Sequence, residues 1–558
     1  MELKKDAPAR PWVKHYPKGV PTEIRPDQYA SIIELFELST EKFARRDAFT
    51  NMGSAITYEE LEEMSRDFAA FLQNRGLKKG DRIAIQMPNL LQYPIALFGA
   101  LRAGLIVVNT NPLYTAREMR HQFKDSGATA IVILANFASI LEEVLPDTDI
   151  EHVVVTQLGD MLGFPKSLIV NSVVKHIKNL VPPYDIEGAV DFYAALDEGA
   201  MNDFVAPTMS GDDLAFLQYT GGTTGVAKGA MLNHRNMIAN MLQIGEWMNP
   251  LLGVGTESIV TALPLYHIFS LTVNCLAFMH RGATNILITN PRDISAFIKL
   301  LRKTHFTVFT GVNTLYNGLM NHEDFTSIDF SALKISVAGG MALQKAVAAR
   351  WSKMTGTPLI EGYGLTETSP VAVVNPVDGT DRAGCIGLPV PSTDVKLIDE
   401  QGNVAAPGAP GEICIKGPQV MQGYWKNESE TLNVMLTGGW LKTGDIALFE
   451  GDGFLKIVDR KKDMILVSGF NVYPNEIEDV VASHPAVAEV AAIGVPDEHS
   501  GEAVKIFVVK KGTVTAEEII AHCRKGLVGY KIPKNVEFRN ELPKTNVGKI
   551  LRRALREG

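Results

Sequence analysis

The chain is poor in cysteine, with Cys275, Cys385, Cys414 and Cys523 as its only four in 558 residues. They are widely separated, and no two of them form a Cys-x-x-Cys pair. This spacing argues against a structural zinc site or a disulfide framework and is typical of a reducing compartment. The first residues, MELKKDAP, also lack the apolar core of a signal peptide, so we expect a cytoplasmic protein.

A long apolar run and an excess of basic residues are also missing. The most apolar region, residues 93–108, contains Arg102 and is shorter than the ~20 residues that a membrane-spanning helix needs. The formal net charge is −9, whereas nucleic-acid-binding proteins usually carry a basic excess, so no nucleic-acid partner is expected. The length exceeds that of one typical hydrophobic core, which predicts at least two domains.

What is present is a regular alternation of short β-branched runs and helix-like segments. Residues 82–86 (RIAIQ) and 130–134 (AIVIL) are predicted strands, and residues 91–102 are a predicted helix. Such alternation is typical of mostly parallel, doubly wound sheets. After residue 394 the strands become short and are separated by glycine and proline, which indicates an antiparallel or barrel-like subdomain.

The predicted fold class is therefore α/β, with a large N-terminal domain of doubly wound sheets and a small α+β domain at the C-terminus. We place the N-terminal domain at residues 1–459, with the barrel-like subdomain at about 390–459. The C-terminal domain is placed at residues 460–558, after the charged connector around residue 460.

The densest cluster of chemically informative residues is the segment 219–229, YTGGTTGVAKG. Its glycines let backbone N–H groups approach an anion, its threonine hydroxyls can donate to that anion, and Lys228 adds a positive charge. The segment therefore predicts a phosphate-binding loop. It is not a Walker A loop, because that motif has glycine where this chain has Ala227 and serine or threonine where it has Gly229.

Four other segments carry residues that suit a nucleotide, and each has a purely structural alternative. In residues 361–368 (EGYGLTET) the tyrosine can face a purine and the glutamate can hold Mg²⁺, or the segment is a surface turn. Asp445 can accept from ribose hydroxyls or cap a turn. The basic residues 460–462 and Lys549 can contact phosphates or be solvated surface charges.

Taken together, the order and spacing of these five segments resemble the adenylate-forming superfamily of acyl-CoA synthetases, luciferases and peptide-synthetase adenylation domains. The resemblance extends from about residue 35 to residue 553 and is most specific in residues 439–478. With residues 219–235 and 263–269 (LPLYHIF), it is similar to bacterial long-chain fatty acid–CoA ligases in particular. Most of the superfamily has proline where this chain has Ala227, a variant that the long-chain ligases share.

The resemblance implies a reaction in two steps. A fatty acid and ATP give acyl-AMP and pyrophosphate, and CoA then attacks acyl-AMP to give acyl-CoA and AMP, with Mg²⁺ as cofactor. A ligase for a medium-chain or aryl acid is the alternative within the enzymes. A non-catalytic binding protein is disfavoured because the charged residues of the five segments are all present.

Roles for single residues follow from the same resemblance. The residues expected to cradle the β- and γ-phosphates are Thr220, Gly221, Thr223, Thr224, Gly225 and Lys228. Those expected to border the adenine are Gly339, Gly340 and Tyr363, and Gly362 and Gly364 are also expected to bind the nucleotide. Thr366 would contact the α-phosphate, Glu367 would hold Mg²⁺, Asp445 and Arg460 would bind the ribose, and Lys549 would bridge the fatty carboxylate and the α-phosphate. The residues expected to take part in catalysis are Lys549, Glu367, Thr366 and Lys228.

For the second step, the resemblance implies a mobile C-terminal domain that rotates about Lys462. The rotation would withdraw Lys549 and turn Ser468 and Gly469 toward the pantetheine arm of CoA. The residues expected to line the acyl pocket are His267, Phe269, Gly311 and Val312, although their apolar surroundings also suit a hydrophobic core. The attacking carboxylate is already ionised at pH 7, so no general base is required and His267 is expected to be a pocket wall.

One segment does not belong to the predicted site. Residues 164–181 (FPKSLIVNSVVKHIKNLV) carry three lysines and no acidic residue. Such a segment can be an amphipathic helix drawn to anionic lipid, or a surface helix packed on the fold. Weak peripheral contact with the inner face of the membrane therefore stays open as an alternative to a purely cytoplasmic protein. A homodimer stays open as well.

Overall fold

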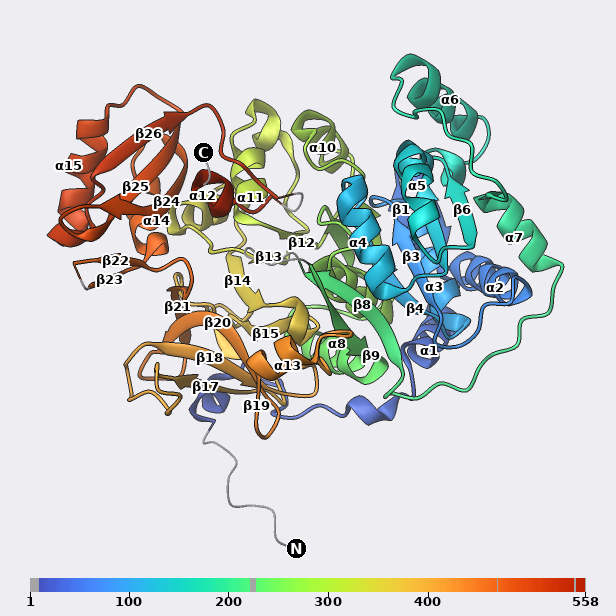
Figure 1. Cartoon of the computed structure of the whole chain (residues 1–558), viewed down its shortest axis with the longest axis horizontal. Helices are drawn as coiled ribbons and strands as arrows, with labels where there is room; N and C mark the ends of the chain where they lie inside the picture. Colours follow the sequence, from blue (N-terminus) through green and yellow to red (C-terminus); the bar gives the residue numbers. More distant parts are fainter. Residues whose placement is uncertain (1–9, 221–226, 469, 546–547, 557–558) are drawn as a thin grey trace, which may run out of the picture.

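The computed structural model describes residues 10–220, 227–468, 470–545 and 548–556. Within these residues, the strands form four sheets. In Figure 1 the first lies on the right, the third at the lower left and the fourth at the upper left. The first two are large and mostly parallel, the third is a small antiparallel sheet, and the fourth belongs to a separate C-terminal lobe. The predicted α/β class with a barrel-like subdomain and an α+β C-terminal part is confirmed.

The first sheet has the strand order β7-β6-β5-β3-β4-β8-β9. Its strands are β3 (Arg82–Gln86), β4 (Ile106–Asn109), β5 (Ala130–Leu134), β6 (His152–Thr156), β7 (Val190–Asp191), β8 (Leu214–Thr220) and β9 (Lys228–Asn233). The helices that connect them include α2 (Tyr58–Asn74), α3 (Gln92–Arg102), α4 (Ala116–Ser126), α5 (Ala138–Val144) and α7 (Phe192–Ala200). The antiparallel pair β8–β9 flanks the glycine-rich segment that the sequence analysis singled out.

The second sheet has the order β16-β15-β14-β13-β12-β10-β11-β1-β2. Its strands are β1 (Asp47–Asn51), β2 (Ser54–Thr57), β10 (Ser258–Thr261), β11 (Thr284–Leu287), β12 (Val308–Gly311), β13 (Ile335–Gly339), β14 (Leu359–Gly364), β15 (Val371–Val374) and β16 (Leu388–Pro389). Its helices include α1 (Ile32–Phe43), α8 (His234–Met248), the π-helix η7 (Ser270–Ala277), α9 (Phe278–His280), α10 (Ile294–Leu301), α11 (Asn313–Met320) and α12 (Lys345–Thr355).

Local sequence explains where these elements begin and end. The predicted strands at residues 82–86 and 130–134 are β3 and β5 with the same bounds, and the helix predicted at 91–102 is α3, one residue shorter. Helix α2 begins at a capping box, in which Thr57 accepts from the amide of Glu60 and Glu60 accepts from the amide of Thr57. The strands β3 and β5 are buried along nearly all of their residues, as expected for the centre of a parallel sheet.

The third sheet is antiparallel and follows the second directly. It contains β17 (Asp394–Ile398), β18 (Gly411–Lys416), β19 (Met435–Leu436), β20 (Trp440–Phe449) and β21 (Leu455–Arg460), together with α13 (Glu428–Val434). The fourth sheet contains β22 (Ile465–Val467), β23 (Phe470–Val472), β24 (Val487–Asp497), β25 (Gly501–Lys510) and β26 (Asn535–Arg539). Helices α14 (Pro474–Ala482), α15 (Ala516–Gly526) and α16 (Arg552–Arg556) complete the C-terminal lobe, drawn in red in Figure 1.

The C-terminal lobe has its own hydrophobic core between α14, α15 and the fourth sheet. The third sheet ends at Arg460 and the fourth begins at Ile465, so the short turn between them is the covalent link of the two parts. The four cysteines are buried and free. In the ranges that the structure describes, no helix is both long and apolar enough to span a bilayer.

Candidate active site

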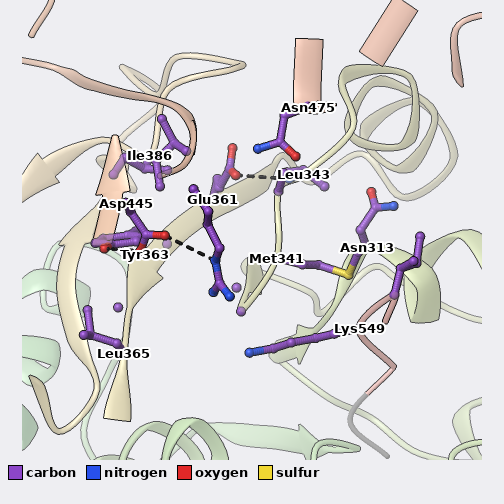
Figure 2. Close-up of a pocket in the computed structure, with 18 of the residues that line it drawn as sticks. Asn313, Met341, Leu343, Glu361, Tyr363, Leu365, Ile386, Asp445, Asn475 and Lys549 are labelled. Carbon is purple, nitrogen blue, oxygen red and sulfur yellow. Dashed lines mark hydrogen bonds and ion pairs between the residues drawn. The ribbon is translucent and has the colours of Figure 1, made fainter. Parts of the chain in front are cut away.

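A cavity of about 1650 Å³ lies where the second sheet, the third sheet and the C-terminal lobe meet. Figure 2 shows part of it, with Tyr363 and Asp445 on one side and Lys549 reaching in from the other. Most of the described residues that the sequence analysis predicted for the site line this cavity: Thr220, His267, Phe269, Gly339, Gly340, Gly362, Tyr363, Gly364, Thr366, Glu367, Asp445, Arg460, Lys462 and Lys549. They come from segments far apart in the sequence, and the fold brings them together.

The carboxylate of Asp445 is held in place from two sides. Strands β20 and β21 pair with Asp445 directly opposite Arg460, and the Arg460 Nε lies 3.2 Å from Asp445 Oδ1. The hydroxyl of Tyr363, on β14, donates to Asp445 Oδ2 at 2.7 Å. Because Asp445 is itself buried, this arrangement presents an oriented pair of acceptor oxygens at the cavity wall.

Two glycines at the end of β13 leave the space that neighbouring side chains occupy. A Cβ atom on Gly339 would lie 2.9 Å from the ring of Phe269. Gly340 has a φ of +80°, and a Cβ atom there would lie 3.2 Å from Cε of Lys549. The turn after β13 therefore requires glycine both for its backbone conformation and for the entry of Lys549.

Lys549 reaches the cavity because its segment is docked on the N-terminal part of the chain. Thr314, in α11, donates its hydroxyl to the carbonyl of Gly548 at 3.0 Å. The Lys549 ammonium forms no hydrogen bond or ion pair with the residues that the structure describes. Burial and the charge of Arg460 lower the pKa of Lys549 to about 8, against the opposing effect of Asp445 and Glu367. The amine is thus a cation near neutral pH that faces an open space.

Glu367 lies in the short helix η9 (Thr366–Thr368) and has one oriented oxygen. Its Oε1 accepts a hydrogen bond of 2.6 Å from the hydroxyl of Tyr424. Its Oε2 accepts none from the described part of the chain. A carboxylate with one oxygen free and next to a nucleotide-sized cavity fits Mg²⁺, which usually binds one or two carboxylates plus substrate phosphates. Within the described residues there is no cluster of three or more metal-ligating side chains, so this is not a closed protein cage.

Lys228 is next to Tyr424, the partner of Glu367, but is not among the residues that line the cavity. It begins β9, directly opposite Thr220 on β8, and forms an ion pair with Glu430 of α13. Its ammonium also lies 5.2 Å from the centre of the Tyr424 ring. Sequence reasoning missed Tyr424 and Glu430, because they lie in a stretch without a glycine-rich motif and reach the site only through packing against β9.

Other predicted residues lie elsewhere or outside the described ranges. Gly221, Thr223, Thr224, Gly225 and Gly469 lie outside the residues that the structure describes. Ser468 follows β22, and its amide donates to the carbonyl of Ser500 at 2.7 Å, away from the cavity lining. Gly311 packs against the ring of Tyr316 and Val312 against Gly548, so in the described structure neither lines the cavity, whereas the next two residues of the chain do.

His267 lies at the cavity wall. Burial and the nearby Lys549 lower the pKa of His267 to about 3, so the ring is neutral at pH 7. Its Nδ1 accepts from the amide of Phe269 at 3.3 Å. This placement supports the interpretation as a wall residue. Apolar side chains extend the same wall, and sequence reasoning missed those that come from α8: Ile244, Trp247 and Met248.

The turn at Lys462 is spanned by a buried ion network. Arg552 donates to both carboxylate oxygens of Glu478 at 2.9 Å and lies 3.4 Å from Asp463. It also lies 3.8 Å from Asp459, which belongs to β21 on the other side of the turn. Arg552 follows Lys549 by three residues, so the network holds the lysine segment and both sides of the turn together.

Comparison with known proteins gives two family matches and many relatives. Residues 36–425 match the AMP-binding enzyme family, and residues 476–549 match the AMP-binding enzyme C-terminal domain. The chain is 60% identical over 548 residues to a long-chain-fatty-acid–CoA ligase of Escherichia coli O6:H1, with 98% of each chain covered. It is 38% identical over 553 residues to a long-chain-fatty-acid–CoA ligase of Bacillus subtilis, again with 98% of each covered.

The fold is also found among solved structures. An anthranilate CoA ligase in complex with anthranoyl-AMP superposes with a TM-score of 0.85 at 25% identity, covering 96% of this chain and 98% of that one. The resemblance to adenylate-forming enzymes that the five segments indicated is therefore confirmed. With one match over most of its length and another over its C-terminal lobe, the chain belongs to the AMP-binding enzyme family.

Proposed function

We propose that this protein is a long-chain fatty acid–CoA ligase that forms acyl-AMP from a fatty acid and ATP and then transfers the acyl group to CoA. The observation that carries the proposal is the position of Lys549, whose cationic amine enters a cavity lined by Asp445 and Arg460 on one side and by apolar residues of α8 on another. High identity to long-chain ligases over nearly the whole chain supports the choice of substrate class.

The first step joins two anions. A fatty carboxylate must approach the α-phosphate of ATP, and its oxygen forms a bond to phosphorus while the bond to the departing pyrophosphate breaks. The positive charge of Lys549 would offset the repulsion between carboxylate and phosphate as they meet. Thr366 would donate to the α-phosphate from the start of η9. The acyl tail would extend past His267 and Phe269 along the apolar wall.

The nucleotide would lie between the second and third sheets. The oriented oxygens of Asp445 would accept from the ribose hydroxyls, with Arg460 beside them. The ring of Tyr363 and the glycine turn 339–340 would border the adenine. The glycine-rich segment, with Lys228 released from Glu430, would bind the β- and γ-phosphates, and that ion pair must exchange for phosphate contacts.

Magnesium would be held by Glu367 together with phosphate oxygens of ATP. When bound, Mg²⁺ supplies neutralisation of the phosphate charge. The hydroxyl of Tyr424 keeps the Glu367 carboxylate in one orientation, as outer-shell partners of metal ligands commonly do.

Replacing Tyr424 with phenylalanine is therefore expected to raise the Mg²⁺ concentration needed for ATP binding by about tenfold or more. Calorimetric titration of the protein with ATP at a series of Mg²⁺ concentrations measures this effect without turnover. Tyr193→Phe is the matched control, since the Tyr193 hydroxyl donates to the Asp160 carbonyl far from the cavity. An unchanged Mg²⁺ requirement in Tyr424→Phe would show that Tyr424 does not position the metal ligand.

The acidity of Lys549 predicts a pH dependence of the first step. A pKa lowered to about 8 means that the cationic form is present below this pH and is lost above it. We expect kcat/KM for ATP–pyrophosphate exchange to fall about tenfold per pH unit above that value. The assay contains no CoA, so its thiol does not contribute. In Lys549→Arg this decline should disappear, because a guanidinium stays protonated; a decline at the same pH in that variant contradicts the assignment.

The experiment that tests the proposed substrate class is ATP–pyrophosphate exchange across a panel of acids. Long-chain fatty acids are expected to give the highest kcat/KM, because each methylene buried against the apolar wall stabilises the bound acid by about 0.8 kcal/mol. Preference for an aryl or medium-chain acid would replace this proposal with the alternative ligase. Absence of exchange with every acid would leave only a binding function.

A further inference from the structure

Outside the cavity, the most conspicuous surface feature is the helical segment at residues 164–181. It contains α6 (Lys166–Ser172), which continues directly as the π-helix η6 (Val173–Ile177) and stands out at the top of Figure 1. Helix α6 contains no buried residue, and η6 contains only Val174. The alternative of a helix packed by its apolar face onto the fold is therefore not what the structure has.

The apolar side chains of this segment face water instead. Their exposed fractions are 84% for Phe164, 62% for Leu168, 59% for Ile169, 73% for Ile177 and 52% for Leu180. Isolated exposed apolar residues are ordinary, but five large ones within seventeen consecutive positions, residues 164–180, form a patch that marks an interaction surface.

Polar contacts at several points hold the segment on the turns after β5 and β6 and on the β1–β2 turn, together with the buried Val174. Asn171 donates to Asp160 at 2.9 Å and accepts from the amide of Gly159 at 2.7 Å. Asn136 donates to the carbonyl of Leu180 at 2.9 Å, and the ammonium of Lys166 donates to the carbonyl of Met52. The segment is thus anchored at several points while its apolar side chains remain free to enter another phase.

The charge of the segment indicates what these apolar side chains contact. Residues 164–181 contain no acidic residue, and Lys175 and Lys178 are exposed. Neither lysine has a hydrogen-bond or ion-pair partner in the part of the chain that the structure describes. A second copy of this surface would place lysines against lysines, which opposes self-association through the patch. Basic residues among exposed apolar ones match the headgroup and acyl layers of an anionic bilayer.

We propose that residues 164–180 form a peripheral membrane-binding surface that inserts Phe164, Leu168 and Ile177 into an anionic lipid bilayer, with Lys175 and Lys178 at the headgroups. This goes beyond the proposed ligase reaction and does not depend on it. Vesicle binding can fail while acid-dependent pyrophosphate exchange persists, so failure of one proposal is distinguishable from failure of the other.

Flotation of the full chain with vesicles tests the surface. The protein is mixed either with phosphatidylcholine vesicles or with vesicles that also contain phosphatidylglycerol, and the bound fraction gives a partition coefficient. We expect the anionic vesicles to bind the protein more tightly, and raised salt to weaken this binding. Lys175→Gln combined with Lys178→Gln should lower partitioning by more than tenfold, because each lysine near an anionic surface contributes about fivefold.

The apolar part is tested by Leu168→Ser combined with Ile177→Ser, which should also lower partitioning by more than tenfold. The matched control is Val404→Ser combined with Val254→Ser, at positions 70% and 54% exposed in other parts of the fold. The control should bind vesicles like the parent, and thermal unfolding midpoints should agree for all variants.

Three results would overturn the proposal. The parent protein could show no vesicle binding, the segment variants could bind as well as the control, or the anionic lipid could make no difference. Light scattering of the lipid-free protein tests the other possible occupant of the patch, a second copy of this chain. A dimer that dissociates in Leu168→Ser with Ile177→Ser, but not in the control variant, would assign the patch to self-association and overturn the lipid assignment.

Discussion

Replacement of Lys549 by alanine is expected to lower the rate of ATP–pyrophosphate exchange at least ~100-fold, the scale seen when one preorganised charge-stabilising group is removed. Its amine lies in the cavity, where Glu367, Asp445 and Arg460 act on its charge. Without it, the fatty carboxylate and the α-phosphate approach each other without the cation that Lys549 places in the cavity. Acyl transfer from supplied acyl-AMP to CoA should be largely retained, because in that step the thiol attacks the acyl carbonyl and no carboxylate has to reach the α-phosphate.

The comparison of the two half-reactions makes this prediction specific. Lys534→Ala is the matched control, since Lys534 lies on the same lobe but forms a surface ion pair with Asp497 at 2.9 Å. Exposed ion pairs contribute little, so both half-reactions of the control should stay near the parent rates. Equal loss of both half-reactions in Lys549→Ala would indicate that the residue is structural and would remove the case for two orientations of the lobe.

Replacement of Lys462 by proline is expected to separate the half-reactions in the opposite sense. Pyrophosphate exchange should be mostly retained, and thioester formation from acyl-AMP should fall by about 100-fold, since a catalytic geometry that cannot be reached loses the benefit of positioning. The amide of Lys462 donates no backbone hydrogen bond to the described residues, so proline removes none in the present orientation. The ring fixes φ and thereby opposes rotation about this residue.

The control for this variant is Lys462→Ala, which removes the side chain but leaves the backbone free to rotate. Both half-reactions should be retained more evenly in the alanine variant. Proline at position 462 also restricts Lys461, and any loss from that source affects both half-reactions. The ratio of the two rates therefore isolates the rotation. A proline variant that loses exchange and keeps thioester formation would refute Lys462 as the hinge.

The ion network around Arg552 explains why the present orientation is well defined. Arg552 and Asn475 of the C-terminal lobe both contact Asp459 of β21, and Asn475 donates its amide to Asp459 at 2.9 Å. A rotation about Lys462 moves these groups away from Asp459, whereas the pair between Arg552 and Glu478 lies within the lobe and can persist. A buried charge left unpaired is costly, so the other orientation must supply a new partner or water for Asp459.

Much of the fold was predictable from local sequence. The strands β3 and β5 have the predicted bounds because short apolar β-branched runs suit the centre of a parallel sheet, and the short strands after residue 394 formed the predicted antiparallel sheet. The exposure of residues 164–180 was not predictable, since an amphipathic pattern is the same whether its apolar face meets the protein or a lipid. Only the position of α6 at the edge of the fold decided between them.

For the candidate site, too, the residue types were predictable from the sequence and their contacts were not. By itself, the sequence determined which residue types are available: a glycine-rich segment, the carboxylates Glu367 and Asp445, and a cation near the end of the chain. It did so because glycine, charge and short-range turns are properties of a few adjacent residues. The tertiary structure alone decided which of them meet. The hydrogen bond between Tyr363 and Asp445 joins residues 82 positions apart in the sequence, and that between Tyr424 and Glu367 joins residues 57 positions apart. Such contacts depend on sheet order and on the docking of the C-terminal lobe, and no local pattern records either.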